Sequence, residues 1–466
     1  MPLTVLSDDD VRRLLLELNK QDILDLQQSL ADALHYYSTA TEEDTANGCS
    51  SSYQPLRTSL KRADGQTTLV MPASSNDGTG VKVVTLAGVG ASKAPSSQDT
   101  ASTTSSLSHQ SSKSSSYTME PPQSLSSAQS TTPKGSLTLF DKNGAPRAFL
   151  NAEEITAFRT ALASVMLFKK RRDVHDLVVF GAGKQAYWHI RLALLLRGDD
   201  IHHLNIINRD FERAHKLLSQ LYAPHEEDHS WSVDNHNVPA YRTGTHPTLP
   251  RPKIQILSPH HGEYDRLLKT TIRASSVIFF TTPSTTPLAA TLAAIGSYKP
   301  HMVEIHPDIV KQNVQPEHGH RHFHKHAQQG GAIIVDSVEA CLKEAGEVIQ
   351  AGLGPNEVVE VGELLMLKRD AERRRTECKA RRSEEGLDEG GVELGECEKT
   401  KKKRRGSKKD SDDEGEDKAH KSLMEWLQRG NVIYKSVGLG LMDVVVGMDL
   451  VRLADERGIG TRIESF

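Results

Sequence analysis

The stretch from residue 177 to residue 209 constrains the fold more than any other part of the chain. An apolar run of strand length leads into the turn Gly181-Ala182-Gly183-Lys184-Gln185-Ala186, which is followed by a helical run and a second apolar run. Gly181 permits a tight turn, and Ala186 lets the helix pack close to the strand. Gly183 has no Cβ, so a phosphate can approach the backbone there. This order predicts a βαβ unit that binds a dinucleotide at the helix N-terminus.

The end of the second strand indicates which dinucleotide is bound. An NAD site usually has an acidic residue there for the ribose hydroxyl, whereas an NADP site has an arginine for the extra phosphate. Asn208-Arg209 occupies this position, and a guanidinium can form a forked contact with a phosphate. We therefore predict NADP(H), with NAD(H) as the alternative if the strand ends one residue later and Asp210 takes the acidic role.

Composition favours a cytoplasmic protein with a globular core and polar insertions. The chain has 466 residues, a net charge of −4 and a mean hydropathy of −0.48. The charge gives no bias towards nucleic acid, no run is apolar enough for a membrane helix, and the four cysteines lack disulfide or metal spacing. The first ten residues contain three acids and no arginine, unlike a secretory signal or a transit peptide.

Two segments have too few apolar residues to form a core. Residues 91–134 are mostly Ser, Thr, Gln and Pro, and we predict a disordered insertion there; residues 367–420 are mostly charged and predict an exposed, partly helical or disordered insertion. They divide the chain into a first domain over 1–168, a dinucleotide-binding domain over 169–366 and a C-terminal segment over 421–466.

Short apolar runs alternate with helical patterns in the second domain. Strands are predicted at 254–257, 276–280, 302–305 and 332–336. Such alternation predicts an α/β fold with a doubly wound parallel sheet of the Rossmann type. Thr281-Thr282 follows one of these strands at its carboxyl end, where cofactors bind.

The first domain has a mixed pattern. Two helical patterns lie within residues 3–37, and Asn143-Gly144 predicts a hairpin turn between two strand-like runs. Asn151 can cap a helix over 152–169. We therefore predict an α+β domain before the Rossmann-type one.

The chain resembles the ornithine cyclodeaminase/mu-crystallin family. The matching pieces occur in family order outside the insertions: Pro55-Leu56-Arg57-Thr58, Val70-Met71-Pro72, Val81-Lys82-Val83-Val84-Thr85, Ile155-Thr156-Ala157-Phe158-Arg159-Thr160, the glycine turn, Asn208-Arg209, Asp336-Ser337-Val338-Glu339-Ala340 and Lys435-Ser436-Val437-Gly438. The resemblance implies a Rossmann-type cofactor domain beside a substrate domain that also forms a homodimer. It further implies that the last helix returns to the first domain.

The resemblance also implies the roles of individual residues. Arg57 and Arg159 would bind the carboxylate of an amino or imino acid substrate, and Lys82 would be the active-site lysine. A lysine beside two arginines should have a lowered pKa, which suits proton transfer. The implied cofactor site comprises Gly181, Ala182, Gly183, Gln185, Ala186, Asn208, Arg209, Thr281, Thr282, Lys435 and Ser436.

One position departs from the family pattern. Cyclodeaminases have an aspartate two residues before a proline, whereas here Ile305 precedes Pro307 at that spacing, and Glu304, His306 and Asp308 are the candidates to replace it. The departure favours an NAD(P)H-dependent reductase that transfers hydride to the C=N carbon of a cyclic imino acid or ketimine. The alternatives are an ornithine cyclodeaminase with bound NAD and a non-catalytic binding protein of the mu-crystallin type.

Two further motifs are interpreted as solvated segments rather than as binding sites. Five histidines alternate from His318 to His326, but no cysteine or carboxylate framework surrounds them, so we predict a solvated loop and assign no metal. The basic run Lys401–Arg405 is followed closely by acids, which favours a solvated insertion over a nucleic-acid site.

Overall fold

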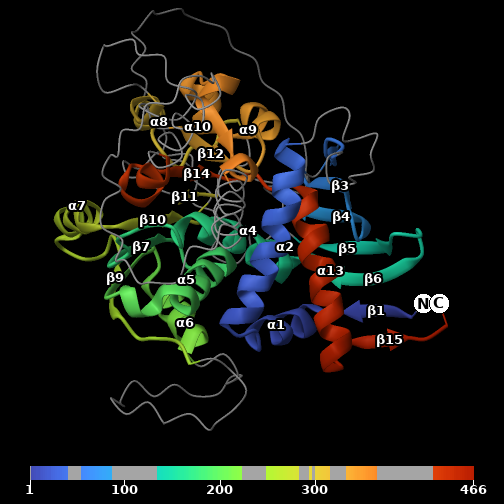
Figure 1. Cartoon of the computed structure of the whole chain (residues 1–466). Helices are drawn as coiled ribbons and strands as arrows, with labels where there is room; N and C mark the ends of the chain where they lie inside the picture. The colour runs from blue at the N-terminus through green and yellow to red at the C-terminus, as the bar shows by residue number, and fades with distance from the viewer. Residues whose placement is uncertain are drawn as a thin grey trace, which may run out of the picture.

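The computed structural model describes residues 2–39, 54–63, 65–86, 134–222, 248–282, 293–295, 300–314, 332–364 and 423–465 (Figure 1). The predicted insertions fall almost wholly outside these residues, as do the His318–His326 and Lys401–Arg405 runs. Within the described residues, no helix combines the length and apolar character needed to cross a membrane.

An eight-stranded sheet forms the core of the second half of the chain. Its strands are β7 (Asp176–Phe180), β8 (His203–Ile207), β9 (Lys253–Leu257), β10 (Val277–Phe280), β11 (Ala293–Ala294), β12 (Ile333–Val335), β13 (Val358–Glu360) and β14 (Ile433–Lys435). Their order is β13-β12-β14-β11-β10-β7-β8-β9, and all pairs are parallel. The strands that follow β7 leave it in two directions, so the sheet is doubly wound as predicted, with its switch point between β7 and β10.

Helices cover both faces of this sheet, which explains why its strands read as continuous apolar runs. Leu177 and Val179 face a core that includes residues of α4 and α5, whereas Val178 and Phe180 face a second core that includes residues of α9 and α10. The helices are α4 (Ala152–Phe168), α5 (Lys184–Arg197), α6 (Phe211–Tyr222), α7 (Tyr264–Ala274), α8 (Pro307–Val314), α9 (Val338–Glu344) and α10 (Gly346–Ala351). Short 3-10 turns lie at Gly198–Asp200 and Pro355–Glu357.

A seven-stranded mixed sheet occupies the other side of the molecule, in the order β15-β1-β6-β5-β4-β3-β2. Its strands are β1 (Leu3–Leu6), β2 (Thr58–Lys61), β3 (Thr67–Ser75), β4 (Gly78–Leu86), β5 (Lys134–Asp141), β6 (Pro146–Asn151) and β15 (Thr461–Ile463). The predicted hairpin is confirmed as β5 and β6, and Asn151 caps α4 by accepting a hydrogen bond from the Glu153 amide.

The last described helix packs on this mixed sheet. Helix α13 (Gly440–Arg457) contacts β3, β4 and β5 and lies beside α2 (Lys20–Thr39), and α1 (Asp8–Leu16) packs at one end of the same layer (Figure 1). Strand β15 then pairs with β1, so both ends of the chain meet at one sheet edge. This return places side chains of α13 against the centre of β4.

Two sequence expectations differ from the structure. The strand predicted at 302–305 is wrong: only Ile305 forms an isolated bridge, and the segment packs against the start of α10, where a Cβ on Gly346 would lie 2.0 Å from the Met302 carbonyl oxygen. Met302, Val303 and Ile305 are buried although the segment forms no strand ladder. In addition, the strand-like piece at 55–58 forms a strand only from Thr58 onward, so Arg57 lies just before β2.

Candidate active site

A cavity of about 220 Å³ lies where the two halves of the molecule meet. The segment before β2, strand β4 and helix α4 contribute Arg57, Lys82 and Arg159 to its wall. The parallel sheet and its loops contribute other residues that the sequence singled out: Gly183, Gln185, Thr281 and Ser436. The fold therefore brings the predicted substrate residues and part of the predicted cofactor turn to one space.

A buried ion-pair network lies at the side of this cavity. Lys82 is on β4, Arg159 is on α4, and both contact Asp443 of α13, which is fully buried. The Lys82 Nζ atom lies 2.7 Å from Asp443 Oδ1, and Arg159 Nε donates to the same oxygen at 3.2 Å. Sequence reasoning missed Asp443, although a carboxylate inside the apolar run after residue 440 was a signal for it.

The environment of Lys82 changes its protonation. The pKa of Lys82 is lowered from 10.5 to about 8, mainly by burial and also by the positive charges of Arg159 and Arg57, whereas Asp443 opposes this shift. The lowering predicted from the neighbouring arginines is present, but desolvation is its largest cause. A lysine with this pKa can exchange a proton near neutral pH.

Arg57 is bound by a carboxylate of the opposite half. Its Nε donates to Glu344 Oε1 at 2.7 Å, and its Nη2 pairs with the second oxygen of Glu344, which ends α9. Burial lowers the pKa of Arg57, and the nearby charge of Arg159 lowers it as well. The two arginines and Lys82 lie beside the carboxylates of Asp443 and Glu344, and the charge of a third carboxylate, Asp336, also acts on Arg57.

The glycine turn has the shape that a dinucleotide phosphate requires. Gly181 has φ +113, and a Cβ at this residue would lie 2.7 Å from Thr281 Oγ1, so only glycine fits. Gly183 is the N-cap of α5, has no side-chain capping bond, and a Cβ added there would meet nothing within 4 Å. Free amides at a helix N-terminus with open space before them fit a phosphate of NAD(P)H. Ala186 is fully buried under the turn, as its predicted packing role requires.

Strand β8 lies beside β7, which leads into the glycine turn, and the residues that follow β8 lie at its carboxyl end. Strand β8 ends at Ile207, so Asn208 and Arg209 are the first residues beyond it. Arg209 is exposed, and the Asn208 amide donates to the Asp210 carbonyl oxygen. The Asp210 carboxylate accepts a hydrogen bond from the Arg213 amide in the first turn of α6. Asp210 thus caps the N-terminus of α6.

The loop after β14 is fixed by a buried aspartate that sequence reasoning did not assign to the site. Asp336 accepts hydrogen bonds from the Ser436 hydroxyl at 2.7 Å and from the Gly438 amide at 2.7 Å. Gly438 has φ +87, and a Cβ there would lie 2.6 Å from Arg159 Nη2. The position of Asp336 as the last residue of a predicted strand was the available signal.

Three other residues of the predicted cofactor site, Lys435, Ala182 and Thr282, lie outside the cavity wall. Lys435 is buried and pairs with Glu304 at 3.3 Å and with Glu347 at 3.1 Å. Ala182 packs against the core, and Thr282 is half-buried beside Gly181. Of the three candidates to replace the missing aspartate, Glu304 is buried on Lys435, whereas His306 and Asp308 face solvent, with side chains 49% and 72% exposed.

The chain was compared with known protein families, sequences and solved structures. No model of a known protein family matches the chain. The structure is similar to that of Δ1-pyrroline-2-carboxylate reductase of Thermococcus litoralis in complex with NADH and L-proline, with a TM-score of 0.57, 16% identity, and coverage of 98% of this chain and 99% of that one. It is also similar to a dimeric archaeal alanine dehydrogenase with bound NAD, with a TM-score of 0.56 and 16% identity over 100% of both chains. The Rossmann-type fold is thereby confirmed.

Sequence relatives agree with the structural ones. The chain is 24% identical to Δ1-pyrroline-2-carboxylate reductase of Bacillus cereus over 331 residues, which cover 69% of this chain and 71% of that protein. It is 26% identical to an uncharacterized protein of Saccharomyces cerevisiae over 245 residues, which cover 47% of this chain and only 59% of the yeast protein. The predicted resemblance to the ornithine cyclodeaminase/mu-crystallin family is confirmed, and these relatives include nicotinamide-dependent reductases.

Proposed function

We propose that this protein is an NAD(P)H-dependent reductase that reduces the C=N bond of a cyclic imino acid or ketimine carrying a carboxylate. One observation carries the proposal: Arg57, Lys82 and Arg159 line the same cavity as Gly183, the N-cap of α5. A bound nicotinamide cofactor would supply a hydride to the substrate carbon. The residues of the chain would orient the substrate and exchange the proton.

The two arginines in the cavity wall support a carboxylate substrate. Two guanidinium groups from different elements can fix the plane of a carboxylate, which prevents the substrate from turning away from the cofactor. Arg57 would exchange its partner Glu344 for the substrate or share its donors between them. The remaining lining residues are largely apolar and fit a hydrocarbon ring: Leu69, Met71, Val84, Leu86 and Ile295.

Lys82 is the group placed to exchange the proton. Reduction of a C=N bond adds a hydride to carbon and leaves the nitrogen to take up a proton. With a pKa of about 8, the Lys82 ammonium is mostly protonated at neutral pH and still acidic enough to donate. Asp443 would keep Nζ in place and oppose its premature deprotonation, so we assign it a positioning role.

NADP(H) is the cofactor that we propose. Arg209 is exposed directly after β8, where the 2′-phosphate of NADP would lie, and Asp210 is engaged by the first turn of α6. NAD(H) is the alternative, because the structural relatives described above have NADH or NAD bound. We further propose a homodimer, as the archaeal alanine dehydrogenase is a dimer, and a cytoplasmic location, since the four cysteines lack disulfide spacing.

An ornithine cyclodeaminase is less well supported by this site. Ile305 is fully buried in an apolar core and has no ionisable group, at the position that the cyclodeaminase pattern gives to aspartate. Among the described lining residues the one carboxylate is Glu153, which lies 3.4 Å from Lys184. A diamine substrate would need a carboxylate for its second amino group. A non-catalytic binding protein is disfavoured by the lowered pKa of Lys82, which binding alone does not require.

The decisive experiment follows the consumption of NADPH and NADH by the purified protein. Candidate substrates are Δ1-pyrroline-2-carboxylate and larger cyclic ketimines, with pyruvate plus amines and ornithine as comparisons. Oxidation of NADPH that requires the imino acid supports the proposal. Ammonia release from ornithine without net NADH formation would establish the cyclodeaminase instead, and tight cofactor binding without any turnover would establish a binding protein.

A further inference from the structure

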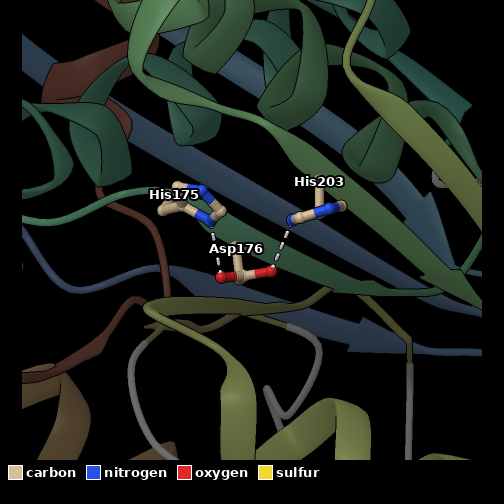
Figure 2. Close-up of side chains that lie close together, drawn as sticks. All are labelled: His175, Asp176 and His203. Carbon is tan, nitrogen blue, oxygen red and sulfur yellow. Dashed lines mark hydrogen bonds and ion pairs between the residues drawn. The ribbon is translucent and has the colours of Figure 1, made fainter.

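A cluster of two histidines and an aspartate lies at the amino end of the parallel sheet. His175 precedes β7, Asp176 is its first residue, and His203 is the first residue of the neighbouring strand β8. The parallel register pairs Asp176 directly with His203. Figure 2 shows both imidazole rings directed at the two oxygens of the Asp176 carboxylate. The glycine turn follows the carboxyl end of β7, so this cluster is at the opposite end of the strand from the proposed active site.

The ligand atoms of the cluster converge. His175 Nδ1 lies 2.8 Å from Asp176 Oδ2, and His203 Nδ1 lies 2.9 Å from Asp176 Oδ1. One nitrogen or oxygen atom from each of the three residues lies within 4.8 Å of the others. His203 Nδ1 is buried and makes no hydrogen bond of acceptable geometry, despite its short distance to the carboxylate. This nitrogen therefore lies close to the carboxylate without a well-aligned hydrogen bond to it.

The backbone beneath the cluster is well fixed. The amides of His202 and His203 both donate to the His175 carbonyl oxygen, at 2.9 and 3.0 Å. The Ser276 amide donates to the Asp176 carbonyl oxygen at 2.9 Å. The side chains above this frame are half-exposed, at 45% for His175, 24% for Asp176 and 40% for His203. The cluster thus combines a rigid base with access from solvent.

We propose that His175, Asp176 and His203 bind a divalent transition-metal ion of the zinc class, with water completing the coordination. Two imidazole nitrogens and one carboxylate oxygen form a ligand set that zinc accepts together with water. Metal–ligand distances of about 2.1 Å in a tetrahedral site place ligand atoms about 3.4 Å apart. This spacing lies between the 2.8 and 2.9 Å contacts to the carboxylate and the 4.8 Å within which all three ligand atoms lie, so modest side-chain rotations would bring them around one ion. The half-exposed imidazoles can make this movement without disturbing the backbone.

The bound ion would link the amino end of β7, the strand that leads into the glycine turn, to the amino end of β8. It would therefore stabilise the parallel sheet without touching substrate or cofactor. Because the site is remote from the cavity, its presence does not depend on the proposed reductase activity.

The test is metal titration of the tag-free full-length protein, with Co²⁺ as a spectroscopic probe and Zn²⁺ as a competitor. The five histidines from His318 to His326 can also bind metal, so the titration uses a background in which all five are replaced by Gln. Asp176→Asn and His203→Gln should each weaken Zn²⁺ binding at least tenfold, since each removes a ligand. His260→Gln removes an exposed histidine outside the cluster and should leave the affinity unchanged.

Two readouts separate metal binding from folding. NADPH binding and the far-UV circular dichroism of each variant report the integrity of the sheet, and His175→Gln replaces any variant that fails to fold. Saturating Zn²⁺ should raise the melting temperature of the background protein but not that of the cluster variants. Equal Zn²⁺ affinity in the background protein and all cluster variants, or no bound metal once the five histidines are replaced, would overturn the proposal.

Discussion

Replacement of Lys82 by Met should change how the stability of the protein depends on pH. Burial lowers the pKa of Lys82 from 10.5 to about 8 in the folded state, whereas the unfolded chain keeps the ordinary value. Between these two values the unfolded state binds more protons than the folded state. The free energy of unfolding of the parent protein should therefore rise with pH across this window, and the full cost of burying the ammonium should be present below it.

The magnitude follows from the two pKa values. They differ by about 2.5, and one pKa unit corresponds to about 1.4 kcal/mol. Lys82 thus contributes a rise of about 3 kcal/mol over the whole window, of which about 2 kcal/mol falls between about pH 7 and about pH 9.5. Lys82→Met removes the titrating group and leaves Asp443 paired with Arg159, so the variant should lack this contribution.

The assay is urea unfolding of the full chain at several pH values, with the difference between parent and variant as the measured quantity. Other groups titrate in both proteins and cancel in this difference. Lys216→Met removes an exposed lysine and controls for the loss of one positive charge. Parallel pH dependence in the parent and in Lys82→Met would refute the inference that Lys82 is a buried ammonium with a lowered pKa.

Three further predictions concern catalysis and cofactor binding. Arg159→Ala should raise KM for a carboxylate substrate and lower kcat while the affinity for NADPH stays unchanged, as measured by steady-state kinetics beside a cofactor titration; a loss of NADPH affinity of similar size would contradict the assigned role. Arg209→Ala should remove a charge-assisted contact worth about 1.5–3 kcal/mol and weaken NADPH binding about 10- to 150-fold with little effect on NADH, and equal binding of the two cofactors by the parent protein would argue against this contact. Gly438→Ala should lower activity, because a Cβ there lies 2.6 Å from Arg159 Nη2 at a φ of +87; kinetics that match the parent would show that the Arg159 side chain adapts.

Local patterns predicted most of the secondary structure because they depend on near neighbours in sequence. The hairpin turn at Asn143-Gly144 and the cap of α4 at Asn151 depend on a few adjacent residues, and both are present. The prediction of a strand at 302–305 was wrong for a physical reason. The apolar side chains of this segment satisfy a strand pattern and are buried, but burial alone does not require a strand ladder, and periodicity cannot tell the two cases apart in a short apolar run.

The sequence by itself determined the dinucleotide-binding turn, since a left-handed backbone at Gly181 and an open helix N-terminus at Gly183 are properties of the adjacent residues. It could not determine the partners of the charged residues. Lys82 and Asp443 are 361 positions apart and meet only because α13 returns to the mixed sheet. Likewise, the parallel register of β7 and β8 alone places His203 beside Asp176. Burial then decided the chemistry, because the same lysine in water would keep its ordinary pKa.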